Sequence, residues 1–423
     1  MSAQTATDVA IIGGGVVGIA TALCLQDAGY SVVLIDRDAP GTGCSSGNAG
    51  VIATSFVLPL SSFSHILGAP KMLMDRMAPL SLPLRYAANY SPWLLRFALN
   101  ALPANRRHTT DRLIQLNEGS AFAWKRLLPD EIYSKIFRNR GMLDVVAAGR
   151  SLDGLIGNAE AIRAEGVPVE LLSAAEVAEL EPLLSGKVAG AALHSAVSQV
   201  ADPKLLSDAM LQRFFERGGT SILLNVTDVL SNADGVEVIG SGRAVRASRA
   251  VISAGWWSPE LLKRFGLHAP LRAERGYHVM LPAMTESFSR PISFHEESFL
   301  ATPMTGGLRL AGTVELAPPH APPNWQRASN LLKLARTYIP DLNTQGWTRW
   351  MGSRPSFADS LPAIGQVTSA PNVFYSFGHQ HLGLTQAAIS AEYIRDIMRG
   401  TMPANIDAYS LSRFNRGTKG QIA

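Results

Sequence analysis

The clearest hydrophobic pattern lies at the start of the chain, where two apolar runs flank a glycine-rich turn. Asp8 to Ile12 is typical of a buried strand, and Ser31 to Ile35 is typical of a second one. Between them, Gly13 to Gly18 predicts a turn and Val16 to Ala28 a helix. Because the connections are very short, the pattern predicts a βαβ unit.

A second pattern covers residues 56–103, which are apolar but interrupted by proline at positions 59, 70, 79, 83, 92 and 103. Proline lacks the N–H that a helix interior needs and clashes with the preceding turn. We therefore expect short helices joined by turns in this stretch and no long helix. Residues 40–55 are rich in Gly, Ser, Asn and Ala and predict a loop.

The rest of the chain alternates helical and strand patterns. Asp111 to Leu128 is amphipathic at helical spacing, and Ser173 with Glu176 three residues on is typical of a capped helix start. Tyr277 to Thr313 is rich in strand patterns, with a hairpin at Thr305-Gly306-Gly307. The other predicted elements are helices at 152–165, 173–180, 202–217 and 384–399, and strands at 141–147, 221–226, 235–239, 250–254 and 372–376.

Composition narrows the class of protein. A chain of 423 residues is too long for one core and fits two domains, and 47% hydrophobic with 17% charged residues indicates an ordinary folded protein. The net charge of +4 is mild and no clustered basic stripe occurs, so no nucleic-acid partner is expected. Two cysteines, Cys24 and Cys44, make a disulfide framework improbable and favour a reducing compartment. With no signal peptide and no transmembrane helix expected, the predicted location is cytoplasmic.

The strongest motif is the glycine triplet Gly13, Gly15 and Gly18. Gly13 allows a sharp turn, Gly15 lets the backbone approach a pyrophosphate, and Gly18 lets the helix pack closely on the sheet. Asp36 ends the next strand, where a carboxylate binds ribose hydroxyls. The motif predicts an adenine dinucleotide on a helix N-terminus, and by itself it leaves both NAD and FAD open.

Two later segments resemble the D-amino acid oxidase superfamily of flavoproteins. Gly43-Cys-Ser-Ser-Gly47-Asn48-Ala49-Gly50 resembles the loop that follows the ribose acid and runs beside the ribityl chain and the flavin ring. Arg249-Ala-Val-Ile-Ser-Ala254-Gly255-Trp256-Trp257-Ser258 resembles the strand and turn that close over the dinucleotide. Together with the first motif, this resemblance favours FAD.

Motifs in the C-terminal half extend the resemblance over most of the chain. They look like bacterial FAD-dependent D-amino acid dehydrogenases, including the branch that acts on D-hydroxyproline. The resemblance implies an α/β fold (α+β overall), with a Rossmann-type FAD-binding domain at 1–58, 188–258 and 350–423. An interleaved antiparallel-sheet substrate domain is expected at 59–187 and 259–349. The motifs are Gly276-Tyr277-His278, Thr302-Pro303-Met304, Leu310 to Glu315, Gly352-Ser353-Arg354-Pro355 and Gly378 to Thr385.

The resemblance also implies which residues contact FAD. Non-covalent attachment is expected, because the covalent variants of the superfamily use a cysteine in the C-terminal third or a histidine where this chain has Gly47, and no cysteine follows Cys44. The expected FAD contacts are Gly13, Gly15, Val16, Val17, Gly18, Asp36, Arg37, Ser45, Ser46, Asn48, Ala49, Gly50, Val226, Ala254, Gly255, Trp257, Gly378, His381, Leu382, Gly383, Leu384 and Thr385.

Five residues are candidates for the substrate end of the site. The family places an arginine before proline at the position of Arg354, and its planar fork suits an α-carboxylate. A salt-bridge arginine remains the alternative. Tyr277 and His278 are expected to face the flavin, unless the sheet around them satisfies them. His379 and His381 lie in a turn that, as the resemblance implies, supports the pyrimidine edge of the flavin. No metal site is expected, because no third ligand accompanies these histidines.

The implied reaction is hydride transfer from the α-carbon of a neutral amine to flavin N5, with a small amino or imino acid as substrate. A D-amino acid, D-proline or D-hydroxyproline fits the resemblance. Two alternatives stay open: an oxidase of glycine, sarcosine or another secondary amine, and a non-catalytic flavin-binding subunit of a larger complex. No nucleophile-elbow motif occurs, so hydrolase chemistry is not expected.

The electron acceptor is expected to be a quinone or another respiratory carrier, as suits a dehydrogenase. The apolar stretch from Phe56 to Leu102 has few charges and includes Trp93. It is either a membrane-surface or quinone-facing patch, or a segment that packs under the substrate domain. The first interpretation places the protein peripherally on the inner face of the cytoplasmic membrane.

Overall fold

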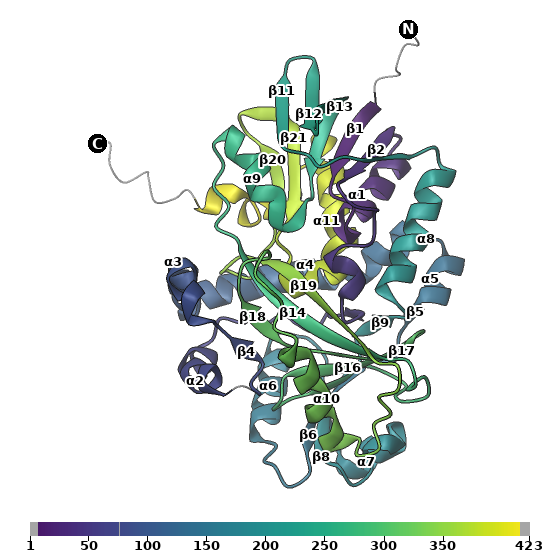
Figure 1. The fold of residues 1–423 in the computed structure, drawn as a ribbon, viewed down its shortest axis with the longest axis vertical. Helices are drawn as coiled ribbons and strands as arrows, with labels where there is room; N and C mark the ends of the chain where they lie inside the picture. The colour runs from purple at the N-terminus through teal and green to yellow at the C-terminus, as the bar shows by residue number, and fades with distance from the viewer. Residues whose placement is uncertain (1–6, 76, 415–423) are drawn as a thin grey trace.

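The computed structural model describes residues 7–75 and 77–414. The chain forms two large sheets in separate halves of the molecule, each packed with helices (Figure 1). An eight-stranded, largely parallel sheet lies nearest the N-terminus, and a ten-stranded, largely antiparallel sheet lies in the other half. This mixture confirms the predicted fold class.

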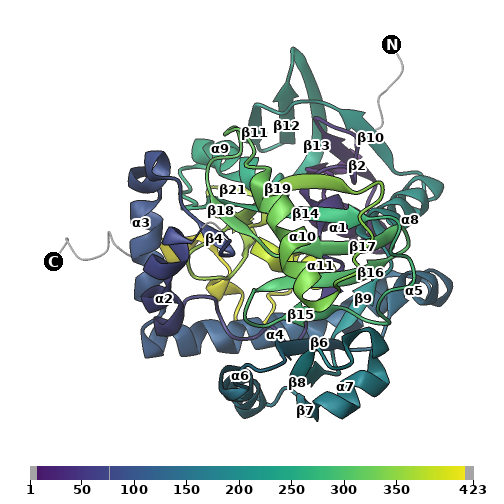
Figure 2. The same ribbon diagram turned by 60° about the horizontal axis from the view of Figure 1, so that its bottom comes forward.

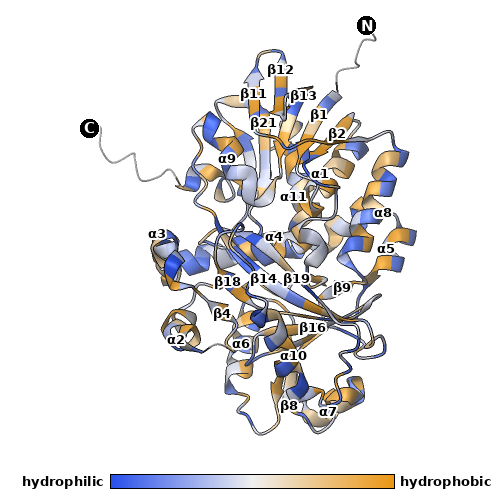
Figure 3. Ribbon diagram, viewed as in Figure 1, coloured by the Kyte–Doolittle hydropathy of each residue, from blue (hydrophilic) through white to orange (hydrophobic). Residues whose placement is uncertain are grey.

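The predicted βαβ unit is confirmed. β1 (Thr7–Ile12) and β2 (Val32–Asp36) pair in parallel, and α1 (Val16–Asp27) connects them. Both strands are almost completely buried, and Figure 3 shows them as strongly hydrophobic. Strands that are apolar on both faces require a covering layer on each side of the sheet.

The first sheet extends from β1 through two parallel partners. β13 (Arg243–Ile252) pairs with β1, and β21 (Ala370–Phe377) pairs with β13. A hairpin and one further strand add antiparallel edges, so the predicted strands of this half are confirmed with shifted ends. The remaining strands are β10 (Thr220–Leu223), β11 (Asp228–Asn232), β12 (Gly235–Gly240) and β20 (Ala363–Val367).

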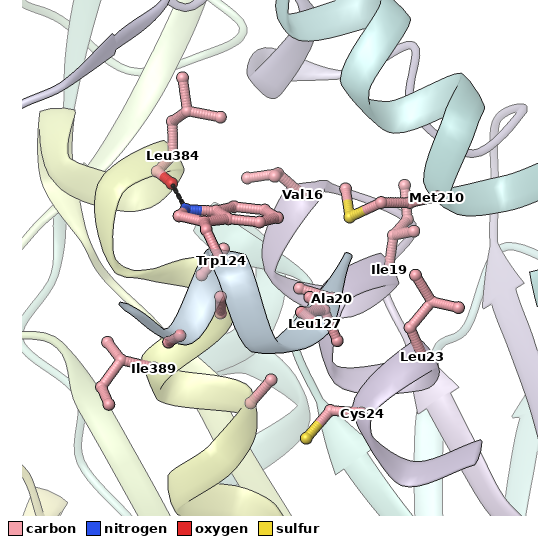
Figure 4. Close-up of a cluster of buried hydrophobic side chains, with 14 of the residues drawn as sticks. Val16, Ile19, Ala20, Leu23, Cys24, Trp124, Leu127, Met210, Leu384 and Ile389 are labelled. Carbon is pink, nitrogen blue, oxygen red and sulfur yellow. Dashed lines mark hydrogen bonds between the residues drawn. The ribbon is translucent and has the colours of Figure 1, made fainter. Parts of the chain in front are cut away.

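Helices cover one face of this sheet and form a continuous apolar core. Trp124 is fully buried there, and its Nε1 donates a hydrogen bond to the Leu384 carbonyl at 3.1 Å (Figure 4). The side chains of Val16 and Ile389 belong to the same cluster. This core fixes the N-terminal ends of α1 and of α11 relative to each other. The helices are α1, α4 (Pro103–Leu127), α8 (Pro203–Glu216) and α11 (Gly383–Met398).

The second sheet is centred on β14 (Arg272–Leu281), which pairs antiparallel with β17 (Gly307–Ala311) and β19 (Thr348–Ser356). The predicted strand-rich segment is thus confirmed, whereas β19 was not predicted because its Gly and Pro are uncommon within strands. The other strands of the second sheet are β4 (Leu80–Ser81), β6 (Met142–Ala147), β7 (Glu170–Ser173), β8 (Val188–His194), β15 (Ile292–Phe294), β16 (Phe299–Met304) and β18 (Val314–Leu316). A small third sheet consists of β3 (Val51–Ile52), β5 (Phe137–Arg138) and β9 (Ser198–Val200).

The two faces of β14 have different surroundings, because successive side chains of a strand point to opposite sides. Tyr277 and Val279 belong to an apolar core that also contains the inner face of α10 (Gln326–Tyr338). Glu274, Gly276 and His278 alternate with them and line a cavity between the two sheets. This alternation decides which residues of β14 can meet a ligand.

The expectation of no long helix in the proline-interrupted stretch is wrong. α2 (Phe63–Met74) and α3 (Leu84–Asn100) each contain a proline, and α3 continues for 17 residues through Pro92. The helix tolerates Pro92 because the carbonyl of Ala88, which loses its usual donor there, accepts a hydrogen bond from the Ser91 hydroxyl at 2.9 Å. Figures 1 and 2 both show α2 and α3 side by side at one edge of the molecule.

The helices predicted at 152–165 and 173–180 are confirmed, whereas those at Asp130–Ile136 and Ser258–Leu262 were not predicted. Ser173 and Glu176 form the predicted capping box at the start of α7 (Ala174–Leu180). No helix in the described ranges is long and apolar enough to cross a membrane. The other helices are α5 (Asp130–Ile136), α6 (Asp153–Ala164) and α9 (Ser258–Leu262).

The sheets suggest where the domains divide. β8 and β19 belong to the second sheet, although the sequence analysis assigned most of both to the FAD-binding domain. We propose that the FAD-binding domain resumes after His194 and again after Ser356. The crossings between the domains then fall at the ends of strands, as expected for a chain that passes between two cores.

Candidate active site

The turn after β1 has the form that a phosphate cradle requires. Gly13 has φ +113°, and a Cβ there would overlap the backbone of Ser253 at the end of β13. A Cβ at Gly18 would overlap the Gly13 carbonyl, so α1 could not start so close to the strand. The N-terminus of α1 therefore opens directly into the cavity, where its N–H groups and positive dipole favour an anion.

Asp36 ends β2 beside this turn. Its Oδ2 accepts a hydrogen bond from the Gly14 N–H at 2.5 Å, and its Oδ1 accepts one from the Asp38 N–H at 3.0 Å. Arg37 follows and stacks its guanidinium 3.8 Å above the Trp257 ring. Asp36, Arg37 and Trp257 all line the cavity, so this end of it offers a ligand a carboxylate and a stacked guanidinium–indole pair.

The loop of residues 43–50 is held against the cradle from both sides. The Ser45 hydroxyl accepts a hydrogen bond from Val16 N–H at 3.0 Å, in the first turn of α1. From β17, Arg309 donates to the carbonyls of Ser46 and Asn48. Arg309 is buried, and this burial lowers its pKa to about 10, with the charge of Asp202 opposing the change. The sequence analysis missed Arg309, because no local motif connects it to this loop.

His278 holds the same loop from β14. Its Nδ1 lies 3.1 Å from the Gly47 carbonyl, and its ring stacks on Trp350 with the centroids 5.0 Å apart. Burial, and then the nearby charge of Arg309, lowers the pKa of His278 to about 3. The imidazole is therefore neutral at physiological pH, and we assign the proton to Nδ1, which donates to Gly47.

Arg354 lies over a glycine on the cavity face of the second sheet. A Cβ on Gly276 would overlap the Arg354 guanidinium, which also donates from Nη1 to the Thr313 carbonyl at 3.2 Å. Glu274 is the cross-strand partner of Arg354, and His278 lies beyond Gly276 on the same face. The strand pair thus presents a planar cation flanked by a buried carboxylate and a neutral imidazole.

The turn before α11 approaches Arg354 from the other domain. His379 bonds through Nε2 to the Ser390 hydroxyl at 2.9 Å, and Gln380 donates to the Phe357 carbonyl at 2.6 Å. Burial lowers the pKa of His379 to about 3, and burial together with the Arg354 charge lowers that of His381 to about 4. Both histidines are neutral, so this turn presents backbone N–H groups and the start of a helix dipole rather than a fixed cation.

Tyr277 also borders the cavity, but its hydroxyl is bonded within the sheet. Its hydroxyl donates to Glu315 at 2.5 Å and accepts from Arg275 at 2.8 Å and from the Asn324 N–H at 2.9 Å. The side chain is 1% exposed. With its hydrogen-bonding capacity used within the sheet, Tyr277 matches the alternative in which its neighbours satisfy it.

The cavity joins both halves of the predicted site. It has a volume of about 1140 Å³ and extends from the cradle of α1 past Arg354 to the polar residues Asp144 and His295. Most of the predicted residues line it, and the sequence analysis missed Glu274, Phe56 and Asp144. Five predicted FAD contacts do not line the cavity and support its walls instead: Gly18, Ser46, Gly50, Leu382 and Thr385.

Within the described residues, no group of three or more His, Cys, Asp or Glu side chains is arranged to hold a metal ion. The cavity instead combines the glycine turn before α1 and the acid that ends β2 with Arg354 on the wall formed by the second sheet. An elongated cavity of this kind suits a dinucleotide that carries a redox ring to a small acidic substrate.

Comparison with known proteins agrees with this geometry. The chain matches the family of FAD dependent oxidoreductases (DAO) over residues 8–397 and belongs to it. The protein is therefore an FAD-dependent oxidoreductase.

Individual relatives cover nearly the whole chain. A D-amino-acid oxidase from Bradyrhizobium diazoefficiens is 28% identical over 403 residues, which is 93% of this chain and 96% of that protein. Glycine oxidase from Geobacillus kaustophilus has a TM-score of 0.74 at 22% identity, covering 96% of this chain and 98% of its own. L-proline dehydrogenase from P. horikoshii has a TM-score of 0.71 at 18% identity, covering 97% and 98%. These two structures show the fold alone.

Proposed function

We propose that this protein oxidises a small amino or imino acid, such as a D-amino acid, D-proline or D-hydroxyproline. The observation that carries the proposal is Arg354, whose guanidinium lies on the cavity wall between the two domains, over Gly276. A planar guanidinium binds a carboxylate through two parallel hydrogen bonds, which fixes the orientation of the bound molecule as well as its position.

The chain's own groups position such a substrate for oxidation. Arg354 holds the carboxylate, so that the α-carbon lies between the second sheet and the turn of residues 378–383. Bound FAD supplies a hydride acceptor at N5, and no protein nucleophile is needed. Holding the two reactants together removes much of the entropic barrier, and the buried surroundings exclude water from the reacting atoms.

The start of α11 supports charge at the far side of the cavity. Gly383 and Leu384 lie in its first turn and line the cavity. Free N–H groups and the positive end of the helix dipole favour negative charge that develops there during the reaction. Neutral His379 and His381 leave this task to the backbone.

Non-covalent binding of FAD is part of the proposal. Cys24 lies on the buried face of α1 among apolar side chains, and its burial raises the pKa of the thiol to about 11 (Figure 4). Cys44 is exposed and lines the cavity, and desolvation by its surroundings raises the pKa of its thiol, so it is not an activated thiolate. Acid precipitation should release all of the flavin into the supernatant. Flavin that stayed with the precipitated protein would contradict this expectation.

We further propose that electrons pass to a quinone or another respiratory carrier at a membrane surface. α3 exposes an apolar stripe at helical spacing, with Leu84 91% exposed, while its inner face is anchored to the second sheet. Residues 60–107 contain a single acid, Asp75, with one lysine and five arginines. An apolar stripe with basic flanks suits an anionic lipid surface. The stripe is Leu84, Ala88, Pro92, Leu95, Leu99 and Leu102.

A substrate panel tests the proposed function. Purified protein loaded with FAD would be mixed without oxygen with D- and L-amino acids, D-proline, hydroxyprolines, glycine and sarcosine, while the flavin absorbance is followed. Bleaching by D-amino or imino acids supports the proposal, and selective bleaching by glycine or sarcosine supports the alternative oxidase. No bleaching by any compound would indicate a non-catalytic flavin protein. Stoichiometric formation of peroxide during turnover in air would identify oxygen, and not a quinone, as the electron acceptor.

A further inference from the structure

Two buried acids lie on neighbouring strands, Glu274 on β14 and Glu315 on β18, and their surroundings differ. Glu315 on β18 has both of its partners within the sheet. It accepts a hydrogen bond from the Tyr277 hydroxyl at 2.5 Å and forms an ion pair with Arg275 at 3.3 Å. Glu274 points to the other face, where it lines the cavity and is 5% exposed. In the part of the chain that the structure describes, it forms no ion pair with Arg354, although the two are cross-strand partners.

Burying a carboxylate without an ion-pair partner costs free energy, so this arrangement needs a reason. Removal from water raises the pKa of Glu274, and the charge of Arg354 and a hydrogen bond with the Ser356 side chain oppose that change. Arg354 directs one Nη to the Thr313 carbonyl rather than to this acid. The guanidinium and the carboxylate therefore stay separate, side by side on the cavity wall, and each is available to a ligand.

An amino acid carries a carboxylate and an ammonium group on one carbon atom, and these two charges are complementary to Arg354 and Glu274. If Arg354 binds its carboxylate, the ammonium group lies within reach of a group next to Arg354. The ammonium must lose a proton before the α-carbon can give up a hydride, because the nitrogen lone pair forms the new C=N bond. A neighbouring carboxylate is the simplest acceptor for that proton.

We propose that Glu274 is a catalytic residue that binds the substrate ammonium and removes its proton. One N–H bond breaks, one O–H bond forms on Glu274, and the electron pair stays on nitrogen as the neutral amine. Departure of the hydride then leaves the iminium product, and Glu274 returns its proton to water when the product leaves. This inference rests on the proposed oxidation of amino acids.

The pH dependence of flavin reduction tests the role of Glu274. Wild-type protein and Glu274→Gln, both loaded with FAD, would be reduced anaerobically by the best substrate of the panel across a range of pH. In the wild type, the rate should fall as acid protonates Glu274, because the protonated acid accepts no proton. In Glu274→Gln, reduction at neutral pH should be about 10²-fold slower and should recover as the pH approaches that of free amine deprotonation.

Two further measurements distinguish proton transfer from simple support of Arg354. Binding of propanoate, which has a carboxylate and no amine, should perturb the flavin spectrum equally in wild type and Glu274→Gln. Glu274→Asp should restore a wild-type-like acid limb at a reduced rate. Glu315→Gln is the matched control, and it should lower the melting temperature while keeping the wild-type pH profile.

Several outcomes would overturn the proposal. Glu274→Gln with wild-type rates and an unchanged profile would remove it from catalysis. A uniform loss at all pH values, with propanoate binding weakened as in Arg354→Ala, would make Glu274 a positioning residue only. If propanoate perturbs the wild-type flavin but no amino acid reduces it, the proposed function fails, and the role of Glu274 fails with it.

Discussion

The two sheets build their shares of the candidate active site in different ways. In the first sheet, one continuous segment from Gly13 to Asp36 supplies the turn, the helix start and the acid that ends β2. In the second, Glu274 and Arg354 come from strands far apart in the chain and meet only because β14 and β19 pair antiparallel. A site made by one segment is visible as a motif, whereas a site made by strand pairing depends on a register that no single segment reveals.

The largest effect is expected in the first sheet. Gly13→Ala would force an alanine to φ +113° and into the Ser253 backbone, so FAD binding should be abolished. Gly157→Ala, in α6 with open space around it and outside the cavity lining, should keep the flavin. The bound flavin after gel filtration measures both. A yellow Gly13→Ala protein would show that the turn does not form the cradle.

The next largest effect is expected at the arginine. Arg354→Ala removes the carboxylate's charged anchor, so kcat/KM should fall by about 10²-fold or more. Arg349→Ala is the matched control on the same strand, because Arg349 is exposed and rests on Trp325, 4.6 Å from the ring centre. Near-normal kinetics in a folded, yellow Arg354→Ala protein would remove Arg354 from the substrate site.

A smaller loss of kcat/KM is expected when the glycine beneath the Arg354 guanidinium is replaced. Gly276→Ala puts a methyl group where the Arg354 guanidinium lies, and overpacking of about 2 kcal/mol corresponds to about 30-fold in kcat/KM. FAD content should stay normal, since Gly276 belongs to the second sheet. Gly306→Ala, in a hairpin with open space, is the control. A loss of flavin rather than of substrate affinity in Gly276→Ala would argue against the division between the sheets.

One residue of the second sheet, Arg309, is expected to affect FAD binding through the loop of residues 43–50. Arg309→Met removes the donor to the Ser46 and Asn48 carbonyls, so the FAD dissociation constant should rise by about tenfold. Arg246→Met, at an exposed ion pair on β13, should leave it unchanged. Fluorescence titration of the apoprotein with FAD checks both. Equal affinities would show that the loop needs no support from β17.

The smallest effect is expected from the histidines. Those at 278, 379 and 381 have pKa values of about 3 to 4, so they are already neutral above pH 5 and lose no charge as the pH rises. His381→Asn should therefore keep the shape of the pH profile of flavin reduction, in contrast to Glu274→Gln. An acid limb that vanished in His381→Asn would identify this histidine as the titrating group.

Sequence alone predicted the first sheet better than the second. Asp36 and the glycine turn could be predicted because their spacing is fixed by one strand, one helix and one turn. Arg354 was proposed from its motif, but Glu274 has no motif, and its place at the cavity depends on the pairing of β14 with β19. Tyr277 and His278 are neighbours in the chain, and only the strand's alternation separates the buried one from the one at the flavin loop.

The proline-interrupted stretch shows a second limit of sequence reasoning. Pro92 argued against a long helix, yet α3 continues through it because the Ser91 hydroxyl bonds the carbonyl of Ala88. Its inner face is then fixed by Trp93, which donates to the Ser356 carbonyl at 3.1 Å, and by Tyr90, which donates to the Ala273 carbonyl at 2.7 Å. Such tertiary bonds outweigh local helix propensity.

A crystal structure of the protein with FAD and a bound substrate-like carboxylate, such as propanoate, tests the central claim most directly. The account predicts a pyrophosphate at the start of α1, a flavin ring between the loop of residues 43–50 and the turn before α11, and the carboxylate on the fork of Arg354. A flavin ring outside that space, or a carboxylate bound away from Arg354, would contradict it.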